Sequence, residues 1–526
     1  MRTRLALKFF GSVTIVLAGC AAPAHSRTRA KAPAPAPHQQ QHAEIVRVSH
    51  VEPAAAPPAE KPKPSPRAHF VAWLHERLPA GGEIGDGDDR AVTITHTTQD
   101  DKETLESVAR KYLDLTDVYF GSDLATAIAK TNGTKGRTDA PLKPGVRLAI
   151  PHLLSAPYKT GDAERLGWPE DGNLTGLYLR GDTAGRSMFV HILDRMQERG
   201  INLVSIDAKD YDGLLTYPSK VPLAIEAGVI KHPPIRDLAR MIRFVHMRGI
   251  RVAVRVSCFE DESMAKAKPD LAVRAKWGGP YKNGWMDPSN EAAQGYLIDL
   301  VKEGMDAGAD EIQLDYVRYP VLGIKNADFH LPERNLTQVK VITEFVKKVH
   351  AVTSAHKVPL ALDVFGVIAH GNRADIDMLG QDPALLASEV EVLSPMVYPS
   401  HYDKGFMGWD EPGNHPEIVG IGTKGILAQI AAAQKNGEAK KTARIRPWLQ
   451  ANNWKSTNYS PAYIATEIRT ARENGGSGWM MWNPSQEYGY TWQAVRPVAQ
   501  PASAPATSPV AARGSVTPPP SGRAAP

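Results

Sequence analysis

The sequence predicts an α/β protein whose main part is a closed (β/α)8 barrel, preceded by a small α+β module. Two observations support the barrel: short apolar runs recur after residue 174, and helical patterns separate them. Strands that alternate with helices pair in parallel, and eight such strands close into a barrel. A chain of 526 residues is also too long for one compact domain, so we expect additional parts.

Residues 1–20 have the pattern of a bacterial lipoprotein signal peptide. Basic residues precede an apolar run at residues 9–18 that is too short to cross a membrane. The run is followed by Leu17-Ala18-Gly19-Cys20, which resembles a lipobox, so we expect Cys20 to carry a lipid that anchors the exported protein. An ordinary signal peptide that happens to end in cysteine is the alternative. Ala21 follows, which by resemblance to Gram-negative lipoproteins favours the outer membrane, on its periplasmic face or at the cell surface.

Two stretches rich in Pro and Ala flank the part expected to fold. Residues 21–67 predict a disordered, semi-extended linker, because such a composition buries too little apolar surface to offset chain entropy. Residues 497–526 have a similar composition and predict a disordered tail.

Composition and motifs exclude several classes of protein. The 62 basic and 57 acidic residues are nearly balanced and form no basic stripe, so we expect no nucleic-acid partner. His-Glu-x-x-His and Cys/His clusters are absent from the sequence, and we expect neither a metal nor another cofactor. The sequence also lacks the Gly-x-Ser-x-Gly elbow of serine esterases. Cys258 ends an apolar run, which favours a buried small hydrophobe over a nucleophile.

Residues 91–151 form a candidate separate module. Alternating residues near Val92 predict a strand, residues 103–112 and 124–130 predict helices, and residues 146–151 predict a closing strand. This order, with the ending Leu142 to Pro151, resembles the LysM fold, whose members bind peptidoglycan and other glycans that contain N-acetylglucosamine. A spacer that binds no ligand is the alternative.

The barrel is expected within residues 170–496. An open, doubly wound sheet is the alternative, but its Gly-rich phosphate turn is missing after the first run. The eight apolar runs are residues 174–179, 203–206, 252–256, 311–314, 360–362, 392–397, 445–449 and 479–482, and helical patterns include residues 188–199, 235–247, 294–307, 339–349 and 462–473.

In such a barrel the active site lies where the strands end, so we take the polar residues that follow each run as candidates. Cleaving a glycosidic bond needs one carboxyl group as acid and a second as nucleophile or base. Asp315 and Asp363 follow neighbouring runs, which predicts Asp315 as nucleophile or stabiliser and Asp363 as acid/base, although each has a structural alternative. The residues predicted to bind substrate are Asp207, Lys209, Asp210, Arg318, Tyr398, His401, Gln450 and Trp482.

Several blocks make the chain recognisable as a whole. They include Ile206 to Asp210, Asp310 to Pro320, Ser394 to Tyr402 and Gly478 to Asn483, within residues 174–493. At these blocks the chain resembles the glycoside hydrolase family DUF4015, related by fold to the α-amylase-like barrels. The resemblance implies a TIM barrel of sugar-cleaving ancestry.

The same resemblance implies site residues and marks two departures. The amylase-like pattern places an Asp nucleophile after strand four, which Asp315 fits. It places a Glu acid after strand five and a third carboxylate after strand seven, where this chain has Asp363 and Gln450. Asp207, Asp210 or Glu260 are then the candidates for the missing carboxyl.

Two hypotheses follow for the function. The first is a hydrolase of an extracellular or cell-envelope polysaccharide, with an amino-sugar polymer as one substrate class. The second is a carbohydrate-binding envelope lipoprotein that has lost catalysis. The positions after strands five and seven, where this chain has Asp363 and Gln450, discriminate between them.

Overall fold

The computed structural model describes residues 65–497, except residues 88–90, 282–283, 322–323, 330, 332–333 and 440. The signal peptide (1–20, with Cys20) lies outside the described residues, as do nearly all of the linker 21–67 and of the tail 497–526, so these expectations stay predictions. Internal contacts divide the chain into two compact units, residues 1–157 and 158–526. Among the helices in the described ranges, none is long and apolar enough to cross a membrane.

The first unit contains a three-stranded antiparallel sheet and two packed helices. The predicted strand, helix, helix and closing strand correspond to β2, α2, α3 and β3, whereas α1 and β1 were not predicted. Thr104 begins α2 with a capping box, and apolar side chains of α2 and α3 are buried at helical spacing. Its LysM-like nature stays a prediction. The elements are α1 (Pro66–His75), β1 (Gly82–Asp86), β2 (Val92–Thr97), α2 (Leu105–Tyr112), α3 (Gly121–Thr131) and β3 (Arg147–Ile150).

The second unit is a (β/α)8 barrel of parallel strands, as the sequence predicts. Each of the eight apolar runs is a strand, and neighbours in sequence are neighbours in the sheet. The strands are β4 (Leu174–Leu179), β5 (Leu203–Lys209), β6 (Arg251–Ser257), β8 (Glu311–Asp315), β10 (Leu360–Phe365), β11 (Val392–Met396), β12 (Arg444–Ile445) with β13 (Trp448–Gln450), and β14 (Gly478–Trp482).

The seventh strand closes the barrel although it is interrupted. Its first half, β12, pairs with β11, and its second half, β13, pairs with β14. Arg446 and Pro447 separate the halves, and Pro447 has no N–H for a ladder hydrogen bond. The backbone N–H of Arg446 still donates to Leu393, and the Pro447 carbonyl accepts from Met480, at 3.0 Å each. The two ends of the sheet are therefore one chain segment, which leaves no open edge.

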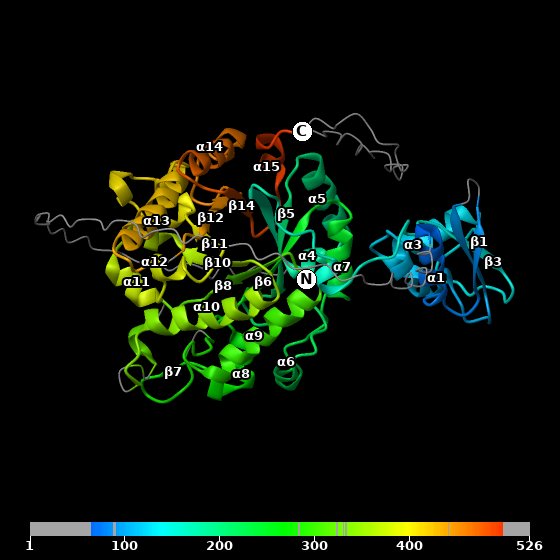
Figure 1. Cartoon of the computed structure of the whole chain (residues 1–526), viewed down its shortest axis with the longest axis horizontal. Coiled ribbons are helices and arrows are strands. Elements are labelled where there is room, and N and C mark those ends of the chain that lie inside the picture. The colour runs from blue at the N-terminus through cyan, green and yellow to red at the C-terminus, as the bar shows by residue number, and fades with distance from the viewer. Residues whose placement is uncertain are drawn as a thin grey trace, which may run out of the picture. The chain divides into compact units, whose positions relative to one another are not determined.

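Helices surround the strands, as Figure 1 shows for α5, α7, α9, α10, α13 and α14. Side-chain caps fix where several begin: Asn290, Thr337 and Ser460 accept from backbone N–H groups in the first turn of α9, α10 and α14. The helices are α4 (Gly181–Ala184), α5 (Ser187–Glu198), α6 (Pro222–Ala227), α7 (Leu238–His246), α8 (Glu262–Ala267), α9 (Glu291–Asp306), α10 (Gln338–Ala355), α11 (Arg373–Leu379), α12 (Pro383–Leu386), α13 (Ile418–Lys435), α14 (Pro461–Glu473) and α15 (Gly489–Ala494).

Two strands extend further than predicted, and this changes where their side chains lie. Strand β5 continues to Lys209 instead of ending at residue 206, and β10 continues to Phe365 instead of ending at residue 362. Asp207, Lys209 and Asp363 therefore belong to strands and are buried, rather than following the strands at the rim.

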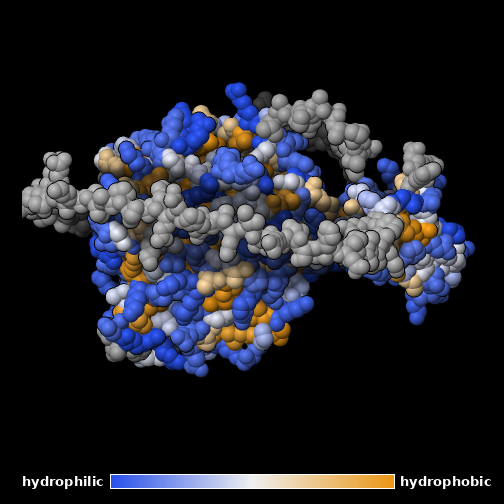
Figure 2. Space-filling model, viewed as in Figure 1, coloured by the Kyte–Doolittle hydropathy of each residue, from blue (hydrophilic) through white to orange (hydrophobic). Residues whose placement is uncertain are grey.

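The barrel interior combines an apolar cluster with polar layers. Tyr178, Ala253, Trp448 and Met480 belong to one buried cluster inside the sheet. Figure 2 shows that the visible outer face is mostly hydrophilic, with hydrophobic residues in small separate groups.

Candidate active site

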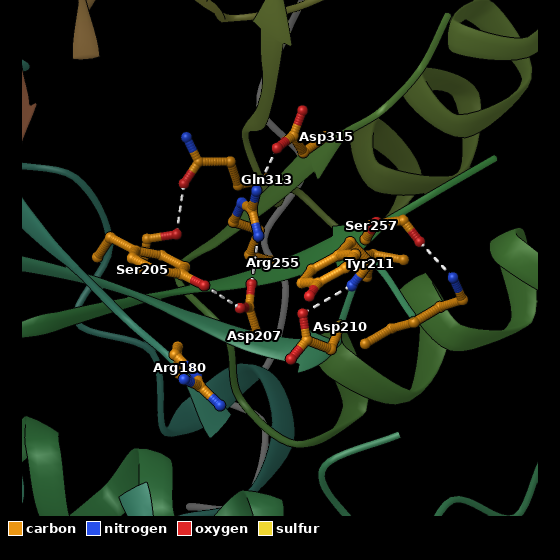
Figure 3. A network of polar contacts seen from close by, with 12 residues as sticks. Arg180, Ser205, Asp207, Asp210, Tyr211, Arg255, Ser257, Gln313 and Asp315 are labelled. Atoms are coloured by element: carbon orange, nitrogen blue, oxygen red, sulfur yellow. Dashed lines mark hydrogen bonds and ion pairs between the residues drawn. The ribbon is translucent and has the colours of Figure 1, made fainter. Parts of the chain in front are cut away.

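An arginine in the third barrel strand, Arg255, lies among carboxylates from three other strands. Figure 3 shows its contacts with two of them, Asp207 and Asp315. Arg255 forms ion pairs with Asp207 of β5 and Asp315 of β8, and its Nε lies 3.5 Å from the Asp363 Oδ2 of β10. All four side chains are buried. One guanidinium thus faces three carboxyl groups, and a fork of five N–H donors suits such a cluster.

The register of the strands brings these groups to one level. Asp207 lies opposite Arg255, and Ser257 lies opposite Asp315. Residues two apart on a strand share a face, so Arg255 and Ser257 face inward together. The hydroxyl of Tyr178 donates to Asp207 Oδ2 at 2.5 Å, which satisfies the remaining oxygen of that buried carboxyl. Burial raises the pKa of Asp207, and the charge of Arg255 opposes that shift.

Asp315 is the last residue of β8, where the chain leaves the barrel. Its Oδ2 contacts Arg255, and its Oδ1 accepts from the backbone N–H of Tyr316 at 2.6 Å. Tyr316 has φ +53°, a left-handed conformation that costs a non-glycine residue roughly 1–2 kcal/mol. Strain stored next to a carboxylate at the rim is typical of functional sites. The contact with Arg255 orients the Asp315 carboxyl group at the strand end.

Asp363 does not lie where the sequence suggested. It lies within β10, two residues before the strand ends, and its Oδ1 accepts from Trp448 Nε1 at 2.7 Å and from Gln313 Nε2 at 2.9 Å. Only 1% of the residue is exposed. Burial raises the pKa of Asp363 to about 8. With these partners and no access to the rim, Asp363 fits a supporting role better than the predicted acid/base role.

Lys209 is likewise placed differently from its expected substrate-binding role. A register shift between Asp207 and Lys209 interrupts the pairing of β5 with β6. The Lys209 ammonium is fully buried, donates to the Ser257 carbonyl at 2.6 Å and lies 2.9 Å from Asp261 Oδ2. It therefore links β5 to the loop after β6 instead of facing a ligand.

Two carboxyl groups at the rim have the properties of general acids. Burial raises the pKa of Asp210, directly after β5, to about 7, and the charge of Asp207 adds to that shift. Burial also raises the pKa of Glu260, in the loop after β6, to about 7; Arg318 opposes this shift and Asp315 adds to it. The Glu260 side chain remains 19% exposed. A carboxyl group that titrates near neutrality suits proton transfer at physiological pH.

Arg318, predicted to bind substrate, is buried and lies beside the carboxyl group of Glu260. Its Nη2 lies 3.8 Å from Glu260 Oε2, and its Nη1 donates to the Tyr319 carbonyl at 3.0 Å. The guanidinium also stacks on aromatic rings, with its Cζ 4.3 Å from the Phe365 ring centroid and 4.9 Å from that of Trp285. Arg318 therefore fixes the position of Glu260.

Three aromatic residues that the sequence predicts to bind substrate, Tyr398, His401 and Trp482, contact one another through their rings. The ring centroids of Tyr398 and Trp482 are 5.3 Å apart, and those of Tyr398 and His401 are 4.8 Å apart. Burial lowers the pKa of His401 to about 3, so its ring is neutral at ordinary pH. Trp482 is only partly buried, which leaves part of its ring available to a sugar face.

The amide group of Gln450 is buried and hydrogen-bonds to neighbouring loops. Its amide nitrogen donates to the carbonyls of Asn452 and Trp454 and to the Ser456 hydroxyl, and its oxygen accepts from the Ser400 N–H at 3.0 Å. Gln450 thus organises the loop after strand seven instead of replacing the missing carboxylate.

The sequence analysis missed Arg255, the centre of the site. The signal was present, because a charged residue interrupts the apolar run Val252 to Val256 at an inward position. Within the described ranges, no group of three or more His, Cys, Asp or Glu residues is arranged to hold a metal ion. The chemistry that these residues support is proton transfer from a protonated carboxyl group beside an ionised one.

Comparisons with known proteins agree with a sugar-cleaving ancestry. The family model DUF4015, described as "Putative glycosyl hydrolase domain", matches residues 176–488, which is more than half of the chain. No curated protein matches the sequence.

Solved structures of similar proteins include a hypothetical protein from Ruminiclostridium thermocellum, with 33% identity over 36% of this chain and 97% of its own, at a TM-score of 0.33. The PgaB (BpsB) glycoside hydrolase domain from Bordetella bronchiseptica has 11% identity, covers 61% of this chain and 99% of its own, and gives a TM-score of 0.44. The spore cortex-lytic enzyme SleL from Bacillus megaterium has 12% identity, 76% and 85% coverage, and a TM-score of 0.37.

Proposed function

Because this chain belongs to the glycosyl hydrolase family DUF4015, we propose that its barrel hydrolyses glycosidic bonds of an extracellular or cell-envelope polysaccharide. One observation carries the proposal. Asp315, paired with Arg255, lies at the same rim as Glu260, a carboxyl group whose pKa is about 7. Glycoside hydrolysis requires two carboxyl groups at one site, one of which gives up a proton.

We assign the acid role to Glu260 and the stabilising role to Asp315. Glu260 gives its proton to the leaving glycosidic oxygen as the bond from that oxygen to C1 breaks. The Asp315 carboxylate stabilises the positive charge that develops at C1. Water then adds to C1 and gives one proton to the Glu260 carboxylate. Glu260 suits this role because Asp315 contributes to its raised pKa, so the two groups lie within electrostatic reach.

The remaining rim residues are proposed to bind and orient the sugar. Asp210 is partly exposed, and its Oδ1 accepts from the adjacent N–H of Tyr211 at 2.7 Å. A carboxyl group has further acceptor capacity, with which Asp210 can bind a sugar hydroxyl. The partly exposed ring of Trp482, backed by the buried ring of Tyr398, suits the apolar face of a pyranose.

The location of the protein and the role of its first unit are also proposals. The lipobox-like Leu17-Ala18-Gly19-Cys20 supports export and lipid anchoring, on the periplasmic face of the outer membrane or at the cell surface. The LysM-like residues 91–151 support binding of peptidoglycan or another glycan containing N-acetylglucosamine. An amino-sugar polymer is then a substrate that both units could engage.

A screen of polysaccharides tests the function. Purified wild type and Asp315→Asn are incubated with peptidoglycan, glycol chitin, laminarin, xylan and pullulan, and new reducing ends are measured. We expect wild type to release products from one class and Asp315→Asn to lose at least about a hundredfold in rate. Equal release by both proteins would remove Asp315 from the mechanism. Binding by wild type without any release would favour the non-catalytic carbohydrate-binding alternative.

A further inference from the structure

One tryptophan of the barrel unit is much more exposed than its size would predict. Trp277 is 74% exposed, and no other large hydrophobic side chain in the described part of the chain exceeds 60%. An indole left in water forgoes the roughly 1.5–3 kcal/mol that burial of a large apolar side chain contributes. The position of this ring therefore calls for a binding partner or a reason to tolerate the loss.

The ring of Trp277 is presented by a tight turn. The N–H of Ala275 donates to the Gly279 carbonyl at 2.9 Å, and the N–H of Gly278 donates back to the Ala275 carbonyl at 2.8 Å. Gly278 has φ +88°, which favours glycine. The benzene part of the indole lies against Gly279, because a Cβ there would be 1.6 Å from Trp277 Cζ3. The turn thus supports one part of the ring and leaves the rest in solvent.

Backbone pairing connects this turn to the proposed acid. Glu260 forms a bridge with Trp285, Ala272 forms one with Met286, and Arg274 forms one with Pro280. Beyond them, β7 (Arg274–Ala275) pairs with β9 (Ala327–Asp328), from the loop after β8. The two loops that follow the third and fourth strands therefore hold Trp277 on the catalytic face of the barrel.

The length of the segment sets the distance scale. Trp277 follows Ala272, next to the Glu260 loop, by five positions, and a chain of that length spans at most roughly 17 Å. Several linked sugar units cover such a distance. A long glycan in the active site can therefore reach Trp277.

We propose that Trp277 is a distal binding platform, on which a pyranose ring of the polysaccharide stacks several units away from the bond that is cleaved. This proposal rests on the proposed function, because it assigns the platform to the same glycan. A sugar ring presents an apolar C–H face about as large as one indole ring, and the electron-rich face of tryptophan attracts it.

The surroundings of Trp277 fit a glycan better than a protein or a membrane. A specific protein interface buries about 1,000 Å² or more, which a single ring between Lys276 and two glycines does not provide. An interfacial membrane segment needs an extended apolar face, which is also missing among the described residues of this turn. One isolated planar ring matches the repeating single-ring faces of a polysaccharide.

Three variants of the full-length protein test the platform. Trp277→Ala removes the ring, Trp277→Phe keeps a smaller one, and Tyr490→Ala, which removes a 43% exposed aromatic residue of α15, is the matched control. With the polymer identified by the screen, we expect Trp277→Ala to lower kcat/KM about tenfold through KM, which corresponds to about 1.4 kcal/mol. Trp277→Phe should lose less, and Tyr490→Ala should match wild type.

The length of the substrate separates a platform from a structural role. On the shortest oligosaccharide that wild type cleaves, Trp277→Ala should be unchanged, because that substrate does not reach the turn. An equal loss on polymer and oligosaccharide, or no loss on the polymer, would overturn the proposal while leaving the hydrolase function intact.

A binding measurement keeps the two proposals distinguishable if wild type cleaves nothing. Acrylamide quenching of tryptophan fluorescence is compared for wild type and Trp277→Phe, with and without glycol chitin, laminarin, xylan or peptidoglycan. Protection that wild type shows and Trp277→Phe lacks would support the platform even though the hydrolase function had failed. If none of these glycans gives such protection, the platform is refuted.

Discussion

At the scale of single residues, the site depends on how one buried cation is shared. Arg255 faces Asp207, Asp315 and Asp363, so the cluster carries more carboxyl groups than positive charges. The energetic cost of burying charge is offset only while the partners are present. At the rim, burial is the main cause that raises the pKa of Asp210 and Glu260, and the neighbouring cluster carboxyl groups Asp207 and Asp315 add to these shifts.

Removing Arg255 should therefore destabilise the barrel. We expect Arg255→Met to lower the free energy of unfolding by about 3–5 kcal/mol, because it leaves buried carboxylates without a cation. Urea unfolding followed by circular dichroism at neutral pH measures this. Arg180→Ala is the control, since the Arg180 side chain is 39% exposed and pairs with Asp182 at the surface. A loss no larger than that of the control would mean that the cluster is not held together by Arg255.

The pKa of Glu260 predicts the pH dependence of the reaction. A general acid works in its protonated form, so activity should fall as pH rises through about 7, the pKa of Glu260. We expect log kcat/KM, measured between pH 5 and 9, to decline with unit slope above that value. In Glu260→Gln this decline should disappear together with most of the activity. An alkaline limb that persists in Glu260→Gln would assign the proton to another group, with Asp210 as the next candidate.

At the scale of helices and strands, the sequence pattern predicted that each barrel strand exists, but it did not predict where each strand ends. Alternating apolar runs and helical patterns identified all eight strands, and so the rim at which Asp315 lies. Strand ends were harder, because β5 and β10 continue through charged residues that ion pairs inside the barrel accommodate. From the sequence alone, Asp207 and Asp363 were therefore predicted to lie at the rim. The ion pair between Arg255 and Asp315 joins two strands that are far apart in the sequence. No local sequence pattern predicts such a contact.

The turn after β5 shows how a loop depends on a neighbouring loop. Gly213 has φ +89°, and a Cβ there would lie 1.8 Å from Asp261 Oδ1, the carboxylate that pairs with Lys209. Gly228 also has a positive φ, of +64°, but a Cβ there would meet open space. The two glycines therefore share a left-handed backbone conformation, and they differ in the space around them.

Alanine substitutions at these two glycines should separate strain from packing. We expect Gly228→Ala to cost about 1 kcal/mol of unfolding free energy, from the left-handed backbone alone. Gly213→Ala should cost about 1–3 kcal/mol more, because Asp261 has to move. Thermal and urea unfolding of both variants measure the difference. Equal costs would show that the contact with Asp261 is relieved without disturbing the Lys209 ion pair.

At the scale of the whole molecule, the seventh strand shows why closure could be predicted although the strand itself is irregular. Pro447 interrupts it, yet the halves pair with different neighbours and complete the barrel. Arg446, inside this interruption, is buried and pairs with Glu311 across the interior. This buried pair joins the interrupted strand to β8. The order of elements therefore determines the topology even where one element is broken.

The division into two units predicts that the barrel is independent of what precedes it. Residues 158–526 make their own internal contacts and contain all eight strands and the site. We expect a fragment of residues 158–497 to unfold within about 2 °C of the barrel transition in the full chain, since domains with their own cores fold alone. It should also cleave soluble oligosaccharides at the full-length rate. Because the LysM-like unit is then absent, cosedimentation of the fragment with peptidoglycan sacculi should weaken relative to the full chain. A fragment that does not fold would make the first unit part of the barrel's stability, and undiminished cosedimentation would place glycan binding in the barrel alone.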